Sequence, residues 1–182
     1  MYRNLFLAVL AVVAISACNQ SKKSCDSEKC TKIEIDQFWT EAPNYVGKAV
    51  CVHGAVNHVC AHGGRKLTLV TSDSSKYLTV FAADTLPAFD STLNGQMVCV
   101  NGVVNETIIN EEYITNMLAK ADSAAKISGT PQAAGDHHTP AQELAEKYRQ
   151  KIKESGTDHY IVYKLTDCNK VCKTEPGCEH KK

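Results

Sequence analysis

The sequence predicts a mainly β protein: a small five-stranded Greek-key barrel with flanking helices, followed by a C-terminal helical extension and a short strand. Two observations support this prediction. In residues 47–56, Val50, Val52 and Val56 alternate with small or polar residues, which is the period of a half-buried strand. The pattern returns at 95–104, where GQMVCVNGVV matches GKAVCVHGAV position by position. The first and fourth strands of such a barrel are neighbours, so the repeat predicts two long paired strands.

The N-terminal residues predict export rather than a membrane span. An apolar run from Leu5 to Ile15 follows a basic start, and it is too short for the roughly 30 Å hydrocarbon core of a bilayer. Residues 15–18, Ile-Ser-Ala-Cys, resemble a bacterial lipobox, in which Cys18 is acylated, for example with palmitate, and begins the mature chain. We therefore expect a signal peptide at 1–17. The mature protein would be lipid-anchored in the bacterial cell envelope, on the periplasmic side or in the outer membrane.

The charge balance argues against a nucleic-acid partner. Removal of the leader takes Arg3 and leaves nineteen Lys and Arg against twenty Asp and Glu. No basic excess is then available to attract phosphates over the whole chain.

The segment before the first long strand predicts a tether and a short helix. Residues 18–32 are polar and small, which is typical of a flexible tether. Across 33–45 the apolar residues follow helical spacing, with Asp36 as the predicted N-cap. Trp39 is then expected to plug one end of the barrel, or alternatively to form a stacking platform for a ligand.

Five segments after the first long strand are strand candidates. Residues 65–71 and 76–82 alternate and flank a polar run, which predicts a hairpin. Residues 96–106 form the predicted fourth strand, and a short piece at 107–110 is the predicted fifth. Residues 159–166 alternate weakly and are expected to add to a barrel edge.

Two helices are predicted after the barrel. From Glu111 the apolar positions follow one helical face, and Thr139 is a suitable N-cap for a second helix that begins at Pro140. The predicted units are the barrel with its flanking helices at 33–127, a linker at 128–139, and a helix, strand and Cys-rich tail at 140–182.

One short motif connects the chain to a known group. The segment Val59–Gly64, VCAHGG, follows the first of the two matching strands. Together these segments resemble the OB-fold lipoproteins of bacteria, over about residues 38–118. The resemblance implies an OB-type barrel with a VCxHGG-like segment, and it implies no particular activity.

Eight cysteines remain after Cys18, and an even number in an exported chain is compatible with disulfides. Cys51 and Cys99 occupy equivalent outward-facing positions of neighbouring strands, so their Cα atoms can lie within the usual disulfide range of about 4.4 to 6.8 Å. A slip in register would instead separate them. The soft ligands of the tail have no CxxC pair and fit disulfides more simply than zinc. The disulfide candidates are Cys25, Cys30, Cys51, Cys99, Cys168, Cys172 and Cys178.

The end of the first long strand is the candidate metal site. His58, Cys60 and His62 recur at every second position, and two imidazoles with one thiolate suit zinc or copper. The parity that buries the valines would turn these residues inward, unless Gly54 bends the strand. Backbone hydrogen bonds at the barrel end are the alternative explanation for them.

No catalytic signature is present in the sequence, so we expect a binding protein and not an enzyme. The first hypothesis is a lipid-anchored binding protein that holds a transition metal. The second is oligosaccharide or single-stranded nucleic-acid binding on the barrel face, with Arg65, Lys66, Lys76 and Tyr77 as local candidates. The third is an envelope lipoprotein that binds a protein partner and no small ligand.

Overall fold

A computed structural model describes residues 30–128 and 139–174. The predicted leader, Cys18, Cys25 and Cys178 lie outside these residues. The described strands are β1 (Thr31–Glu34), β2 (Ala49–Val59), β3 (Lys66–Val70), β4 (Tyr77–Ala82), β5 (Met97–Ile109) and β6 (Tyr160–Lys173). The helices are α1 (Phe38–Glu41), α2 (Glu111–Ser128) and α3 (Pro140–Ser155), with 3-10 turns η1 (Ile35–Gln37), η2 (Ala42–Asn44) and η3 (Ser91–Leu93).

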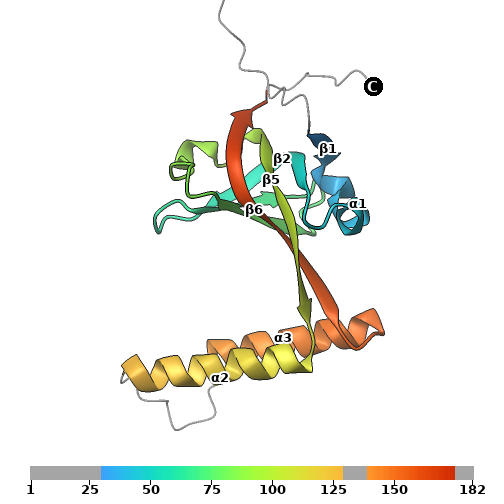
Figure 1. The fold of residues 1–182 in the computed structure, drawn as a ribbon, viewed down its shortest axis with the longest axis vertical. Coiled ribbons are helices and arrows are strands. Elements are labelled where there is room, and N and C mark those ends of the chain that lie inside the picture. Colours follow the sequence, from blue (N-terminus) through green and yellow to red (C-terminus); the bar gives the residue numbers. More distant parts are fainter. Residues whose placement is uncertain (1–29, 129–138, 175–182) are drawn as a thin grey trace, which may run out of the picture.

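The strands form the predicted barrel (Figure 1). Their order is β1-β2-β3-β4-β6-β5, and β5 also pairs with β2, which closes the sheet. The β4–β6 pair is parallel, whereas β2–β3, β3–β4, β5–β6 and β2–β5 are antiparallel. This is the connectivity of an OB-type barrel, so the predicted fold class is confirmed. The two matching segments are neighbours, in a register that runs from Ala49↔Val103 to Ala55↔Met97.

The fifth strand of the barrel is not the predicted one. Residues 107–110 do not form a separate strand, because β5 runs unbroken to Ile109. The barrel is closed by β6, which begins at Tyr160 and pairs with both β4 and β5. The predicted boundary at 128–139 therefore falls inside an insertion between the fourth and fifth barrel strands. The prediction took the next β-forming segment along the chain, residues 107–110, as the fifth strand. The strand that pairs with β4 and β5 instead begins some fifty residues later, at Tyr160.

Two details before β2 also differ from the prediction. Thr31 and Lys32 do not belong to the tether, because they pair in parallel with Val50 and Cys51 as the start of β1. Asp36 does not cap the helix but accepts a hydrogen bond from the Ser72 backbone N–H at 2.8 Å. The hydrogen-bond partner of the Asp36 carboxylate is therefore in the turn between β3 and β4.

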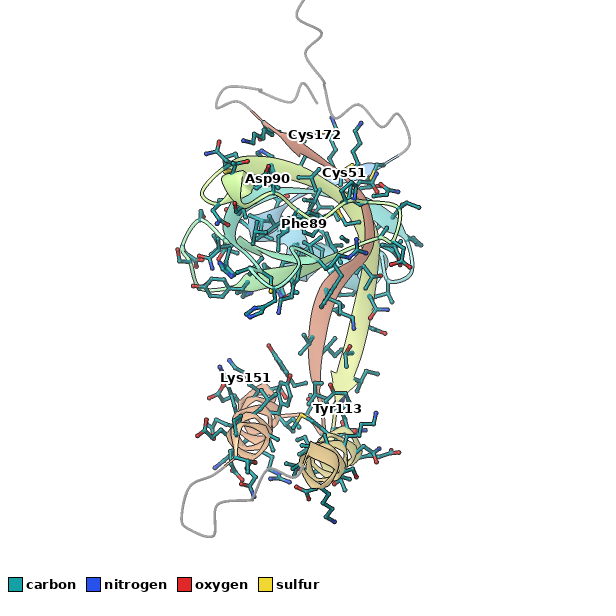
Figure 2. All side chains as sticks on the ribbon, turned by 90° about the vertical axis from the view of Figure 1, so that its left-hand side faces the viewer. Cys51, Phe89, Asp90, Tyr113, Lys151 and Cys172 are labelled. Carbon is teal, nitrogen blue, oxygen red and sulfur yellow. The ribbon has the colours of Figure 1, made fainter. Side chains whose placement is uncertain are left out.

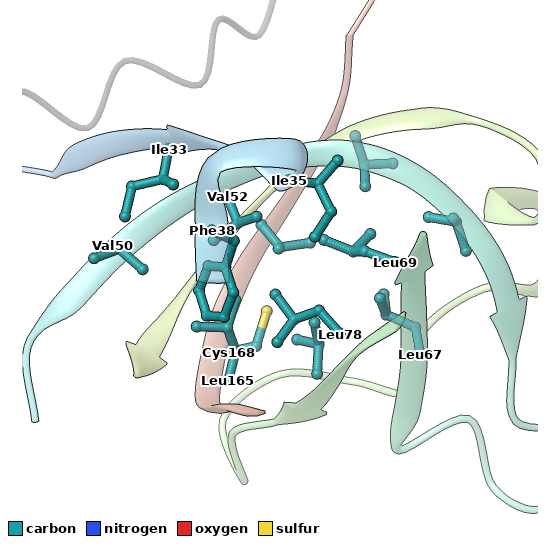
Figure 3. Close-up of a cluster of buried hydrophobic side chains, with 14 of the residues drawn as sticks. Ile33, Ile35, Phe38, Val50, Val52, Leu67, Leu69, Leu78, Leu165 and Cys168 are labelled. Atoms are coloured by element: carbon teal, nitrogen blue, oxygen red, sulfur yellow. The ribbon is translucent and has the colours of Figure 1, made fainter. Parts of the chain in front are cut away.

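Phe38 is the aromatic plug of the barrel core (Figure 3). Its side chain is fully buried, whereas Trp39 is only half-buried at the edge of the core. The two rings meet edge to face with centroids 5.5 Å apart, and the Lys76 ammonium lies 5.4 Å from the centroid of Trp39. Trp39 therefore packs against Phe38, and the Lys76 ammonium lies over the Trp39 ring.

The insertion is a helical hairpin carried on a two-stranded ribbon (Figures 1 and 2). β5 and β6 continue as a pair beyond the barrel, to the rung Ile109↔Tyr160. Ile109, Ile114 and Ala145 form a second small core there. Thr139 caps α3 as predicted, with a capping box to Gln142. No helix in the described part of the chain is long and apolar enough to cross a membrane.

Candidate functional site

A register shift in β2 decides which way the predicted ligands point. The pairing with β3 is irregular between Val56 and His58. Val56 and Val59 are both buried although they are three residues apart, and His58 between them is exposed. The extra residue of a bulge reverses the alternation of a strand. The predicted inward orientation of His58 is therefore wrong, and the irregularity follows Val56 rather than lying at Gly54.

The three predicted metal ligands do not form a metal-holding group among the described residues. Cys60 is half-buried where β2 ends, and its backbone N–H donates to the Lys66 carbonyl at 2.8 Å. His62 is exposed in the following turn, which closes as the Gly64 N–H donates to the Cys60 carbonyl at 3.1 Å. Within residues 30–128 and 139–174, no group of three or more His, Cys, Asp or Glu residues is arranged to hold a metal ion. The donor set suits zinc or copper chemically, but this geometry gives it no support.

Arg65 ties two loops together. Its guanidinium donates to the backbone carbonyls of Leu86 at 2.7 Å and Ala83 at 2.9 Å. A further bond reaches the Ala82 carbonyl at 3.1 Å. Three backbone acceptors satisfy most of the planar donor fork, so Arg65 holds the end of β4 against the turn after β2. Of the cations predicted to bind a ligand, Arg65 is therefore bound to backbone carbonyls. Lys76 lies over the Trp39 ring.

The outer side of the barrel carries an ordered set of exposed and half-buried side chains. The pairing of β3 with β4 places Val70 opposite Tyr77, Thr68 opposite Thr79, and Lys66 opposite Phe81. These side chains alternate with Leu67, Leu69, Leu78 and Val80, which are fully buried in the core. We call the outward-facing set the outer-face platform; its members are His58, Lys66, Thr68, Val70, Tyr77, Thr79, Phe81 and Lys164.

Two aromatic rings stand on the platform. Tyr77 is 53% exposed and Phe81 is 40% exposed, which is unusual for large apolar side chains on a paired strand. Both lie on the same face of β4, four residues apart, which corresponds to about 13 Å along the strand. Thr79 lies between them on that face.

A polar row crosses the platform between the rings. His58 pairs with Thr68, Thr68 with Thr79, and Thr79 with Lys164. Register partners present their side chains on the same face, so this row joins β2, β3, β4 and β6. The platform therefore combines flat apolar surfaces with hydroxyl, imidazole and ammonium groups. That combination suits a ligand with both apolar faces and many hydroxyl groups.

The sequence identified part of this platform. Lys66 and Tyr77 were predicted, and the alternation of residues 76–82 extends the exposed face from Tyr77 to Phe81. His58 was placed on the wrong side because a bulge has no marker in the sequence pattern. Lys164 was missed because residues 159–166 were predicted to add to a barrel edge, and their pairing with β4 was not predicted.

A second cluster lies on another part of the barrel exterior, where the structure brings Cys51, labelled in Figure 2, close to Cys99. Cys51 opposes Asn101 and Cys99 opposes His53, so the two cysteines are diagonal neighbours on one face of the β2–β5 pair. Their thiols are hydrogen-bonded to each other, and they are only 2% and 6% exposed. The hydrogen bond with Cys51, together with burial, raises the pKa of the Cys99 thiol.

The other described cysteines differ in their surroundings. Cys30 accepts a hydrogen bond from the Asn101 side-chain amide at 3.5 Å, and Cys172 lies opposite Cys99 on β6 and is disulfide-bonded. Cys168 is a thiol in the barrel core, fully buried, where burial raises its pKa to about 11. Its prediction as part of a tail disulfide is not matched by this position, because β6 carries it inside the barrel.

Comparisons with known proteins do not identify a family for this chain. No family model matches the chain, and no curated protein matches it. Among solved structures, one similar chain is titled a "putative aspartyl-tRNA synthetase from Leishmania major Friedlin". It is 14% identical, with a TM-score of 0.39, over 84% of this chain and 22% of that chain. This chain thus spans less than a quarter of that protein, and the likeness says nothing about activity.

Proposed function

We propose that this protein is a lipid-anchored binding protein of the bacterial cell envelope whose outer-face platform binds an oligosaccharide. The observation that supports the proposal is the pair of exposed rings, Tyr77 and Phe81, on either side of a polar row. Both rings lie on β4, which pairs with β3, so the platform covers the second and third strands of the barrel. OB-type barrels commonly bind oligosaccharides and oligonucleotides on this face.

The chemistry of the platform favours sugars. A sugar ring has apolar C–H faces that stack on aromatic rings, and hydroxyl groups that exchange hydrogen bonds with threonine, histidine and lysine side chains. Tyr77 adds a phenolic hydroxyl to its apolar ring, which suits a surface that contacts both water and ligand. The spacing of about 13 Å between the rings requires an extended ligand with more than one ring.

Nucleic acid is the weaker candidate for the same surface. A strand of phosphates needs several cations along its path. The platform offers Lys66 and Lys164, whereas the Arg65 guanidinium is bound to backbone carbonyls and Lys76 lies over Trp39. Two cations fit a sugar polymer with scattered carboxylates better than a continuous polyanion.

Anchoring and location rest on the predicted lipobox at Cys18, and the assignment as a binding protein rather than an enzyme remains a prediction. We do not retain a metal at His58, Cys60 and His62 in the proposal, because these donors do not converge.

Tyr77→Ala and Phe81→Ala test the proposed site. Stacking of a nucleobase on one aromatic side chain contributes about 1–3 kcal/mol by alanine substitution. With the lower end of that range for a sugar ring, each variant should weaken binding roughly tenfold. The affinities are measured by affinity electrophoresis in gels that contain a neutral β-glucan or a carboxylated polygalacturonate. Tyr113→Ala is the matched control, because Tyr113 is 37% exposed but lies on α2.

We expect retardation by at least one polysaccharide, with the affinity about tenfold weaker in both platform variants and unchanged in Tyr113→Ala. Equal retardation of all three variants would place the site elsewhere. Binding of oligo-dT instead of either polysaccharide would replace sugar by single-stranded nucleic acid as the ligand.

A further inference from the structure

The thiol pair on the β2–β5 face is independent of the proposed ligand site. Cys51 and Cys99 lie on the exterior of the barrel wall, because Val50 and Val52 on one strand and Val98 and Val100 on the other fill the interior. They are nevertheless almost fully buried. The two thiols are buried side by side outside the main core cluster, on the outer side of the β2–β5 pair.

Strand geometry explains how the two thiols meet. In an antiparallel pair, diagonal neighbours are further apart than direct partners, but the twist of the strands shortens one of the two diagonals. Cys51 and Cys99 are diagonal neighbours in the β2–β5 register, and the interaction between their thiols raises the pKa of Cys99. Cys30 is also near, but its sulfur accepts the Asn101 amide at 3.5 Å.

We propose that Cys51 and Cys99 are a reversible redox site that forms a cross-strand disulfide between β2 and β5. The oxidant is a small-molecule disulfide such as oxidised glutathione. One protein thiolate attacks it, forms a mixed disulfide and releases one thiol. The second protein thiol then attacks the protein sulfur of the mixed disulfide, loses its proton, and releases the second thiol. Two electrons pass to the oxidant, and two protein thiols become one disulfide.

Cys51 and Cys99 are almost fully buried, so we expect an oxidant to react with them more slowly than with the half-buried Cys60 of the same molecule. The raised pKa of Cys99 keeps its thiol protonated at neutral pH, which lowers its reactivity further.

Peptide mapping of the full chain tests the proposal. Trypsin places Cys51 and Cys60 together in peptide 49–65, and Cys99 alone in peptide 77–120. The Cys60→Ser variant therefore makes a link between these peptides specific for Cys51. The reduced variant is incubated with excess oxidised glutathione, alkylated under denaturing conditions, digested and analysed by mass spectrometry. Cys51→Ser, which keeps Cys60, is the matched control.

We expect peptides 49–65 and 77–120 to become linked in Cys60→Ser, to separate again with dithiothreitol, and to stay unlinked in Cys51→Ser. The oxidised form should melt roughly 5–10 °C above the reduced form, because the bond restricts the unfolded chain. Several results would overturn the proposal: full alkylation of both thiols after equilibration, a link from Cys99 to Cys30 or any other cysteine, or a stoichiometric metal ion that protects both thiols from oxidation.

Discussion

Arg65 was a candidate ligand-binding residue, but its side chain binds backbone carbonyls of the barrel. Its guanidinium donates to the carbonyls of Ala82, Ala83 and Leu86, and it also lies 3.2 Å from an Asp84 carboxylate oxygen. The carboxylate is fully exposed, so the ion pair adds little, and the backbone contacts carry the role. The neighbouring Lys66 has the same charge and faces outward. Arg65 lies one residue before β3 and binds backbone carbonyls, whereas Lys66 is the first residue of β3 and is exposed.

Cys168 makes stability depend on pH above neutrality. Burial raises its pKa from 9.0 to about 11, so the folded state keeps the thiol protonated where the unfolded state ionises. The contribution is fully present below pH 9 and is lost as the pH rises from 9 towards 11. Between pH 8 and pH 10 the folded protein should lose about 1.4 kcal/mol through this group.

Urea unfolding of wild type and Cys168→Ala, both under reducing conditions at pH 8 and pH 10, isolates this effect. The free-energy difference between the two proteins should shrink by that amount at the higher pH. A difference that does not change with pH would show that the Cys168 thiol is not protected from ionisation by the fold.

At the scale of elements, the two matching strands use their equivalent glycines for close approach. Gly54 is buried in β2, directly under Ile35 of η1. Gly102 in β5 is approached by the Thr166 carbonyl of β6. The long strands can therefore be crossed by other parts of the chain at their midpoints. The repeated motif is thus explained by packing as well as by pairing.

Gly54→Ala should destabilise the barrel. The new Cβ atom would lie 2.8 Å from the Cβ atom of Ile35, which is closer than packed carbon atoms approach. Overpacking of this kind costs about 1–3 kcal/mol in the free energy of unfolding. Chemical denaturation measures it, with Ala55→Ser on the opposite side of β2 as the control. An unchanged free energy in Gly54→Ala would mean that η1 moves away without cost.

At the scale of the whole molecule, the helical hairpin occupies the loop position between the last two barrel strands. Its small core packs on the side of the ribbon that carries Ile109, Tyr160 and Val162. Lys164 of the platform lies on that same side, because it is two residues further along β6 than Val162. The hairpin and the platform are therefore on one side of the continuous β5–β6 pair. Arg149 joins the helices by donating to Glu111 at 3.0 Å.

Removal of the hairpin should leave a folded barrel. Ile109 and Tyr160 are direct register partners, so an Asn-Gly turn can replace residues 110–159. Ile109→Thr is included because the helices no longer cover that side chain. We expect cooperative thermal unfolding by circular dichroism and unchanged polysaccharide affinity. Loss of cooperative unfolding would show that the barrel needs the hairpin, and lost affinity in a folded barrel would show that the hairpin contributes to the ligand site.

Several features were predictable from the sequence because they depend on local periodicity. Alternation in 47–56 and 95–104 defined two strands, and their matching registers implied that they pair. The capping signals at Thr139 and Pro140 defined the start of α3. Lys66 and Tyr77 were two of the four side chains predicted for a ligand-binding face of the barrel.

By itself, the sequence determined the class of the fold, its two longest paired strands and its helices, since each depends on side chains only a few residues apart. The tertiary structure alone decided that β6 closes the barrel, that a bulge turns His58 outward, and that Phe38 rather than Trp39 fills the core. These outcomes depend on pairing and packing between segments far apart in the chain. The free-energy differences between alternative strand pairings depend on contacts between distant segments, so no local sequence pattern reports them.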